Sequence, residues 1–337
     1  MLLASLLVIF LLLMLLGRVL APVFLAVALA YVLDDVVSLL VRCRLPRTLA
    51  IVLVGGGVLV TLLFTILAVL PVLSEQIGRL VTHVPQYVQS LRALIQQVSS
   101  EHLDWINPSY VQKAIAAVAS QMQTWGSSLL SFSIASIPGL MTLLVYAFLV
   151  PVMVLFFLKD KQQIIDWGSQ FLPAERNLLA RVWHELDTQI GNYIRGKFWE
   201  AFLAGVSMWL VYWWMGHEYA LLLGVLTGIS VWIPFVGAAV VTLPVILLSL
   251  FQWGWNEMFF YAVLAYGVVQ TIDANVVVPW LFSEIVNLHP VAIIVAILIF
   301  GSLWGILGVV IAIPMAALVK SVVSIILERR QVITLKK

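Results

Sequence analysis

Charged side chains are scarce in this chain of 337 residues. Only 10% of the residues are charged, whereas 63% are hydrophobic, and the mean hydropathy is +1.10. A soluble domain carries roughly 25% charged residues, so most of this chain cannot face water. The net charge is only +2 and the basic residues form no stripe, which argues against nucleic acid as a partner.

Cysteine is scarcer still, since Cys43 is the one cysteine of the sequence. It cannot form an internal disulfide and has no companions for a metal site. A serine–histidine–acid arrangement, metal-ligand spacing and a phosphate-binding loop are also missing. We therefore expect neither an enzyme nor a bound metal or cofactor.

Long apolar stretches are what the chain has in abundance. A run near twenty apolar residues spans a bilayer core of roughly 30 Å. Uninterrupted candidates are 2–16, 19–41, 49–73, 138–158, 198–215 and 258–281, while the segments 221–250 and 289–319 are broken in the middle. No basic leader precedes 2–16 and no cleavage site follows it, so we interpret it as a retained helix. The predicted fold is an all-α integral membrane protein with about eight hydrophobic segments.

No linker rich in glycine, serine or proline divides the chain, so 1–337 is predicted to be a single membrane transporter domain. Its expected parts, in chain order, are the first three helices (1–73), an extracytoplasmic amphipathic helical excursion (74–137), helix four (138–158), cytoplasmic amphipathic helices (159–197) and a transport core (198–327).

Basic residues in short loops set the orientation of a membrane protein. Arg42, Arg44 and Arg47 lie in one such loop, which is therefore predicted to be cytoplasmic. Both termini are then expected inside and the excursion outside. The two broken segments satisfy this topology either as re-entrant hairpins or as single crossings. We favour re-entrant hairpins, because about thirty residues are long for one span.

The excursion carries one apolar stripe on each side of its middle. Beside a predicted turn at Pro85 the stripe is Val84, Val88, Leu91, Ile95 and Val98, and after Asn107-Pro108 it is Val111, Ile115, Val118, Met122 and Trp125. Seams with this spacing suit helix–helix packing. They contribute either to a homo-oligomer or to packing on the protein's own membrane domain.

The two broken segments share one pattern, in which a glycine-rich break precedes an apolar arm with a proline. Irregular backbone persists in lipid only against protein or a water-filled cavity, and a matched pair of such segments points to a transporter's binding site. The candidates at the breaks are Gly228, Pro234 and Gly237 in the first and Gly301, Gly305 and Gly308 in the second. Tight helix packing is the alternative role of these small residues.

Asp273 is the sharpest polar candidate for ion coupling. It lies about fifteen residues into the segment 258–281, flanked by Gln270 and Asn275. An ionisable residue within a membrane helix is costly and points to function, as a proton carrier or ion ligand. The alternative is a structural ion pair near the inner end of the helix.

Other polar residues have weaker claims. Asn287 is a candidate helix cap, and His289 is either a proton relay or a cap at the entrance to the second broken segment. Glu200, close to Arg195, is expected to form a salt bridge at a surface or interface.

Four stretches together suggest a family. They are YIRGK (193–197), YALLLGVLTGISVWIPFVGA (219–238), DANVVVPWLFSEIVNLHP (273–290) and GSLWGILGVVIAIP (301–314). In this order they resemble the autoinducer-2 exporter family of bacterial permeases. The resemblance implies a multi-pass transporter of the bacterial inner membrane that assembles as a homo-oligomer. Members are associated with autoinducer-2 export and others with sodium/proton antiport, so the resemblance leaves the substrate open.

The leading functional hypothesis is a secondary transporter that exports a small polar metabolite or signalling molecule, with ion coupling as an option. Its partners would be a small-molecule or ion substrate, the lipid bilayer and further copies of itself. A cation/proton antiporter is the alternative within transport. A membrane scaffold that acts through 74–137 is the alternative of another class.

Overall fold

The computed structural model describes residues 2–102, 113, 117, 120, 124, 137–170, 176–234, 236–282, 289–305, 308–317 and 319–320, and its regular structure there is entirely helical. The predicted all-α class is confirmed. In this part of the chain, four helices are long and apolar enough to cross a membrane: Pro22–Arg42, Arg47–Ser90, Val236–Trp253 and Glu257–Phe282. Large apolar side chains such as Phe148 and Leu264 are 73% and 64% exposed, as lipid-facing surfaces require.

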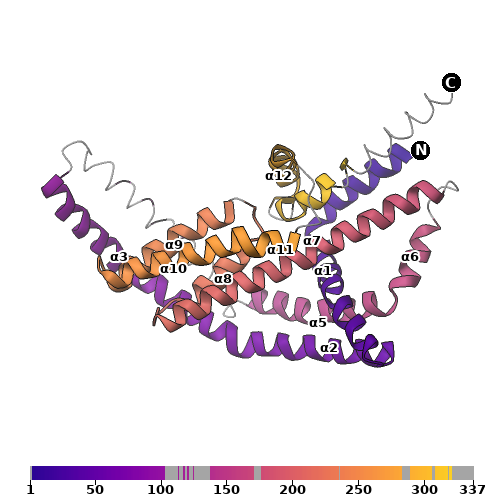
Figure 1. Cartoon of the computed structure of the whole chain (residues 1–337), viewed down its shortest axis with the longest axis horizontal. Coiled ribbons are helices and arrows are strands. Elements are labelled where there is room, and N and C mark those ends of the chain that lie inside the picture. The colour runs from indigo at the N-terminus through magenta and orange to yellow at the C-terminus, as the bar shows by residue number, and fades with distance from the viewer. Residues whose placement is uncertain are drawn as a thin grey trace, which may run out of the picture.

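A first bundle is formed by α1 (Leu2–Arg42), α2 (Arg47–Phe64) and α5 (Ile137–Lys159). Its core contains Ala26, Ala30, Val54 and Val154. The prediction of separate helices over 2–16 and 19–41 is wrong, because α1 is continuous with Pro22 inside it. The helix changes direction instead of ending (Figure 1), as a proline within a helix commonly causes.

A second bundle is formed by α7 (Arg176–Trp214), α8 (Ala220–Ser230), α9 (Val236–Trp253) and α10 (Glu257–Ile272). Met208, Tyr212, Leu223, Val245 and Ala262 lie in its core. Helix α7 is 39 residues long and begins inside the second polar interval, where the short α6 (Lys161–Ser169) precedes it. One helix, α7, therefore contains both the end of this polar interval and the apolar segment that packs in the bundle.

Helix α2 continues through a π-helical turn, η1 (Thr65–Val69), into α3 (Leu70–His102), and this rod reaches one end of the molecule (Figure 1). The predicted turn at Pro85 is wrong, because α3 runs through it. Packing on both sides offsets the cost of the proline. Val84 is 2% exposed, and the Tyr87 ring stacks on Phe251 at 4.3 Å.

The two predicted seams of the excursion are only partly visible. Val84 is buried, which favours packing on the protein's own membrane domain for the start of the first seam. The side chains of Leu91, Ile95 and Val98, and all of the second seam, lie outside the described residues. Their contribution to a homo-oligomer stays a prediction.

Both broken segments are interrupted where the glycines and prolines predict. Helices α8 and α9 are joined by residues 231–235, and α12 (Pro290–Trp304) is followed by the helix Gly308–Ala317. At each break a glycine Cα rests against a main-chain carbonyl: a Cβ at Gly237 would overlap the oxygen of Ser230, and one at Gly308 would overlap that of Phe300. The two segments thus close by the same backbone contact.

Alanine at Gly237 should therefore be severely destabilising. The added methyl group meets backbone rather than a flexible side chain, so we expect a loss of about 3 kcal/mol or more. Thermal unfolding in detergent, followed by tryptophan fluorescence, measures it. Gly267→Ala in α10 is the control, since nothing lies within 4 Å of the added Cβ; it should be neutral or slightly stabilising. Equal melting temperatures for the two variants would contradict the close contact.

The end of the second bundle at the loop between α7 and α8 is organised around His217. The imidazole is 5% exposed. Its Nδ1 accepts a hydrogen bond from the Tyr219 amide at 3.1 Å, and its Nε2 lies 3.4 Å from Ser249 Oγ. Nearby, Gln76 of α3 accepts the Leu222 amide at 2.8 Å. The excursion helix thereby supplies a partner to the free amides at the start of α8.

Burial lowers the pKa of His217 to about 4, so the folded protein keeps the ring neutral. The unfolded chain takes up a proton near pH 6.5. Stability is therefore complete above about pH 6.5 and falls as the pH drops toward 4, by about 1.4 kcal/mol per pH unit. Melting temperatures from pH 7 to 4, compared with those of His217→Gln, isolate this contribution. Parallel curves for the two proteins would show that His217 does not contribute.

Candidate functional site

One turn of α7 holds both broken segments. The Tyr193 hydroxyl donates to the carbonyl of Val310 at 3.3 Å, in the second arm of the second broken segment. The Lys197 ammonium donates to the carbonyl of Val231 at 3.1 Å, where α8 ends. Residues four apart share one face of a helix, so a single face of α7 contacts the two segments at their breaks.

The residues between them tie the same turn to other helices. Arg195 pairs with Asp35 of α1 at 2.8 Å and donates to the Tyr31 carbonyl at 3.1 Å. A Cβ at Gly196 would lie 2.7 Å from the Phe282 ring, so this glycine permits the ring to approach. The whole stretch from Tyr193 to Lys197 is a junction of α1, α7 and the two broken segments.

Lys197 forms a buried ion pair with Glu200. Its Nζ lies 2.8 Å from Glu200 Oε2, and the two side chains are 9% and 5% exposed. The salt bridge expected for Glu200 is therefore present, but it is buried rather than at a surface, and its partner is Lys197 rather than the neighbouring Arg195. The i, i+3 spacing places Glu200 on the Lys197 face of α7, whereas Arg195 points to α1. The ammonium also lies 5.4 Å from the centroid of the Phe282 ring, a favourable arrangement for a cation.

Asp273 lies close to this pair, on an element that packs against α7. It opens η2 (Asp273–Val277), a π-helical turn between α10 and α11 (Val278–Phe282); single π turns within helices are frequent at functional sites. Its Oδ1 is buried and has no hydrogen-bond partner among the described residues. The carboxyl group interacts electrostatically with Lys197 and Glu200. Three ionisable groups thus converge at the first break.

The remaining polar candidates lie elsewhere. Gln270 hydrogen-bonds with the Tyr266 hydroxyl. Asn275 is exposed and donates to the carbonyl of Thr271, in its own helix, at 2.8 Å. His289 is the N-cap of α12 and accepts the Val291 amide at 3.3 Å, which favours the capping role. Asn287 lies outside the described residues.

The glycines and proline of the breaks serve tight backbone contacts. A Cβ at Gly228 would lie 2.8 Å from the Ala201 carbonyl of α7, and one at Gly301 would lie 3.0 Å from Val309. Gly305 has φ 62° and ends α12, a conformation that favours glycine. Pro234 lies in the first break, where its carbonyl accepts the Val236 amide. Together with Gly237 and Gly308, these residues bring the arms together, as the packing interpretation expects.

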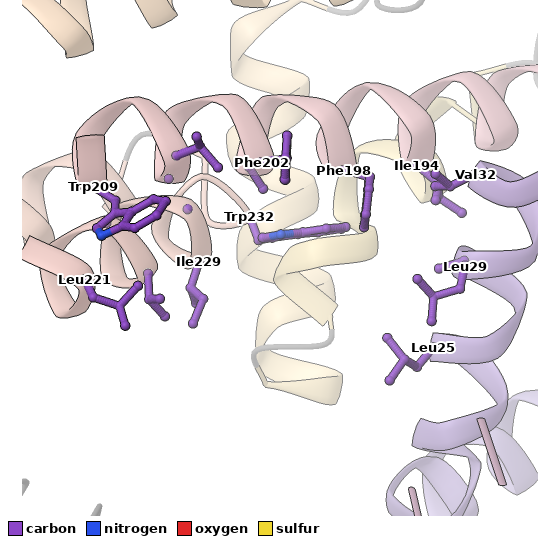
Figure 2. Close-up of a pocket in the computed structure, with 17 residues that line it drawn as sticks. Leu25, Leu29, Val32, Ile194, Phe198, Phe202, Trp209, Leu221, Ile229 and Trp232 are labelled. Atoms are coloured by element: carbon purple, nitrogen blue, oxygen red, sulfur yellow. The ribbon is translucent and has the colours of Figure 1, made fainter. Parts of the chain in front are cut away.

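A groove of about 520 Å³ lies between α1, α7 and α8. Figure 2 shows Leu29 of α1, Phe198 and Trp209 of α7 and Ile229 of α8 around it, with Trp232 lying between them. Every lining residue is apolar, aromatic or glycine, so the only side-chain polar groups there are the indole N–H groups of Trp209 and Trp232, and the groove offers no charged partner. The polar chemistry is concentrated instead at Lys197, Glu200 and Asp273. The described residues contain no cluster suited to a metal ion.

Tyr193 and Lys197 were not among the candidates drawn from the sequence. A signal for them exists: positions 193, 197 and 200 follow the i, i+4, i+7 spacing of one helix face. Their partners are carbonyl groups of distant segments, which no pattern of side chains reveals.

Comparison with known proteins identifies the chain. The family model described as "AI-2E family transporter" matches residues 3–328. The chain belongs to this family. Three AI-2E relatives illustrate its breadth: "Putative permease PerM" of Escherichia coli K12 is 38% identical over 90% of this chain and 86% of its own length. "Putative transport protein YueF" of Bacillus subtilis is 28% identical over 89% and 82%, and "AI-2 transport protein TqsA" of Escherichia coli K12 is 21% identical over 90% and 85%.

AI-2E membership confirms the predicted resemblance. It makes this chain a multi-pass transporter of the bacterial inner membrane, of a family whose members are transport proteins rather than enzymes. The junction Tyr193–Lys197 and the two breaks are therefore parts of a transport protein.

Breaking the buried ion pair should destabilise the protein more than removing it. Lys197→Met leaves the Glu200 carboxylate without its partner, which costs roughly 3–5 kcal/mol. The double variant Lys197→Met/Glu200→Met removes both charges and should recover much of that loss. Melting in detergent, checked by gel filtration, compares the three proteins.

The exposed pair Arg79–Glu75, 2.6 Å apart with side chains 55% and 60% exposed, is the matched control. Arg79→Met should cost less than about 1 kcal/mol. A double variant no more stable than Lys197→Met would show that the two charges do not compensate each other.

Proposed function

We propose that this AI-2E transporter exports a small polar metabolite or signalling molecule and couples the export to an ion through Asp273. Family membership and the name of TqsA, a transport protein for AI-2, support a small signalling solute. The scaffold hypothesis gains no support, because the relatives are named for permeation and transport.

The observation that carries the proposal is the cluster of Lys197, Glu200 and Asp273 at the first break. Only 10% of the chain is charged, yet the buried pair Lys197–Glu200 lies beside a third ionisable group, the half-buried Asp273. Structural stability does not require such a cluster, because buried ion pairs are often no more stable than apolar replacements. Ionisable groups within membrane proteins mark ion and substrate pathways.

Re-entry of the broken segments into the membrane belongs to this proposal. Helix α8 has 11 residues and would be about 16 Å long at 1.5 Å per residue. Helix α12 has 15 residues and would be about 22 Å long. Both are shorter than a bilayer core of roughly 30 Å. These short first arms support hairpins that enter and return; the second arm of the first segment, α9, has 18 residues and would be about 27 Å long.

A cation/proton antiporter is the second candidate, and one observation favours it. The cluster contains two carboxylates and one ammonium, so its charges do not balance when all three ionise. An excess carboxylate attracts a cation. Transport of sodium in place of an organic solute would use the same residues.

The cytoplasmic position of both termini and assembly as a homo-oligomer remain predictions. The basic loop that sets the orientation contains Arg44 in a left-handed turn and connects α1 to α2. Asn287 also remains a candidate of this site.

Asp273→Asn should abolish gradient-driven transport and preserve the fold. Asparagine keeps the shape and hydrogen-bonding capacity of the side chain but cannot titrate. Proteoliposomes with a trapped pH-sensitive dye, given autoinducer-2 in one series and sodium in another, measure the coupled proton movement. We expect a signal with the native protein and background levels with the variant.

Asp166→Asn is the matched control, because Asp166 is an exposed carboxylate of α6. The flux through this variant should equal that through the native protein. Full gradient-driven flux by well-folded Asp273→Asn would exclude the coupling role. A response to sodium but not to autoinducer-2 would select the antiporter.

A further inference from the structure

The Lys197 ammonium is shared between a carboxylate and a main-chain carbonyl of another element. It lies 2.8 Å from Glu200 Oε2 and 3.1 Å from the Val231 oxygen. The Val231 carbonyl is among the last of α8, which have no partner within the helix. The negative end of the helix dipole adds to the attraction. Lys197 thus holds the first break closed against α7.

Asp273 gives this ammonium a second possible partner, because it opens η2, which packs against α7. Its Oδ1 is buried without a hydrogen bond among the described residues, and its charge interacts with that of Lys197. With both carboxylates ionised, the cluster would carry one net negative charge in apolar surroundings. An uncompensated buried carboxylate is strongly disfavoured and is neutralised by taking up a proton.

Among the described residues, no other charged side chain forms an ion pair with the cluster: Asp34 and Asp35 of α1 pair with Lys161 and Arg195, and Glu257 lies in the first turn of α10. Helix α7 contributes Lys197, Glu200 and the Tyr193 hydroxyl, which interacts with Glu200. Helices α8 and α11, with sequences ALLLGVLTGIS and VPWLF, contain no titratable side chain. The described residues of the break, 231–234, contain none either. One proton is therefore sufficient to balance the charges.

We propose that Glu200 and Asp273 hold one proton between them and that Lys197 is a proton-controlled latch on the first broken segment. The proposal rests on the proposed function, in which Asp273 is the coupling residue. With Asp273 protonated, the ammonium stays on Glu200 and on the Val231 carbonyl. When Asp273 loses its proton to water, the new carboxylate attracts the ammonium. The hydrogen bond to Val231 then breaks, and the break is released from α7.

The second broken segment is held differently. Its contact with the same turn is the neutral hydrogen bond from Tyr193 to Val310, which does not involve the ammonium. Loss of the proton therefore releases the first segment while the second stays attached. Lys197 acts as a positioning residue, and its effect is visible in the accessibility of the break.

Cysteine labelling in the full-length protein tests the latch. Ile233→Cys, in a Cys43→Ser background, places one thiol in the break next to Trp232. Maleimide labelling in liposomes is followed from about pH 5 to 9, a range chosen to bracket the titration of carboxyl groups in an apolar environment. Thiol reactivity itself rises with pH, so rates are divided by those of Cys43, which is exposed, in the native protein.

The normalised rate should rise with pH by about tenfold, the scale expected for the loss of one charge-assisted hydrogen bond. Asp273→Asn should remove the rise and leave labelling slow. Lys197→Met should label fast at every pH, because the latch is absent. If Lys197→Met does not fold, Glu200→Gln provides the same test. Without the Glu200 carboxylate the ammonium pairs with Asp273 instead, so labelling should be fast even at low pH.

Lys161→Met is the matched control. Lys161 also pairs with an aspartate, Asp34, at 3.0 Å, but it lies on α6, and its removal should leave the labelling profile unchanged. A flat profile in the native protein, or a rise that persists in Asp273→Asn, would overturn the latch.

Flux in the same liposomes separates the two proposals. Coupled flux with a flat labelling profile would overturn the latch alone. A pH-dependent profile without coupled flux would support the latch and refute ion-coupled transport.

Discussion

An ammonium ion cannot be buried among apolar helices without compensation, and the interior of this protein is arranged around one such ion. Lys197 is compensated by Glu200 at 2.8 Å, by the carboxyl end of α8 through Val231 and by the Phe282 ring. Each partner comes from a different stretch of chain. The requirement to compensate one charge therefore fixes where α8 and α11 meet α7.

The junction on α7 and the glycine contacts at the breaks act together. Gly237 and Gly308 bring the two arms of each segment close enough for backbone to touch backbone. The adjacent carbonyls of Val231 and Val310 are then held by Lys197 and Tyr193. Small residues thus determine the shape of each break, whereas α7 determines where each break is anchored.

Much of this fold could be predicted from the sequence, because apolar length and glycine–proline breaks are local signals. The breaks followed from them, and Asp273 was selected as an ionisable residue within an apolar segment. The surroundings of Asp273 did not follow, since Lys197 is 76 positions away and its other partner is a main-chain carbonyl. The turn predicted at Pro85 is wrong for a related reason. The burial of Val84 and the contact of Tyr87 with a distant helix outweigh the local preference of proline for a turn.

The unbroken rod of α2, η1 and α3 has a mechanical consequence. Its helical stretch Arg47–Ser90, which contains an apolar window long enough to cross a membrane, has 44 residues, about 66 Å at 1.5 Å per residue. That is more than twice a bilayer core of roughly 30 Å, so about 36 Å extends past the core. A tilt of roughly 10° at the membrane moves the far end by about 6 Å, as the helix rise implies. A continuous helix of this length would transmit any rotation within the bilayer to its far end as a displacement of several ångströms.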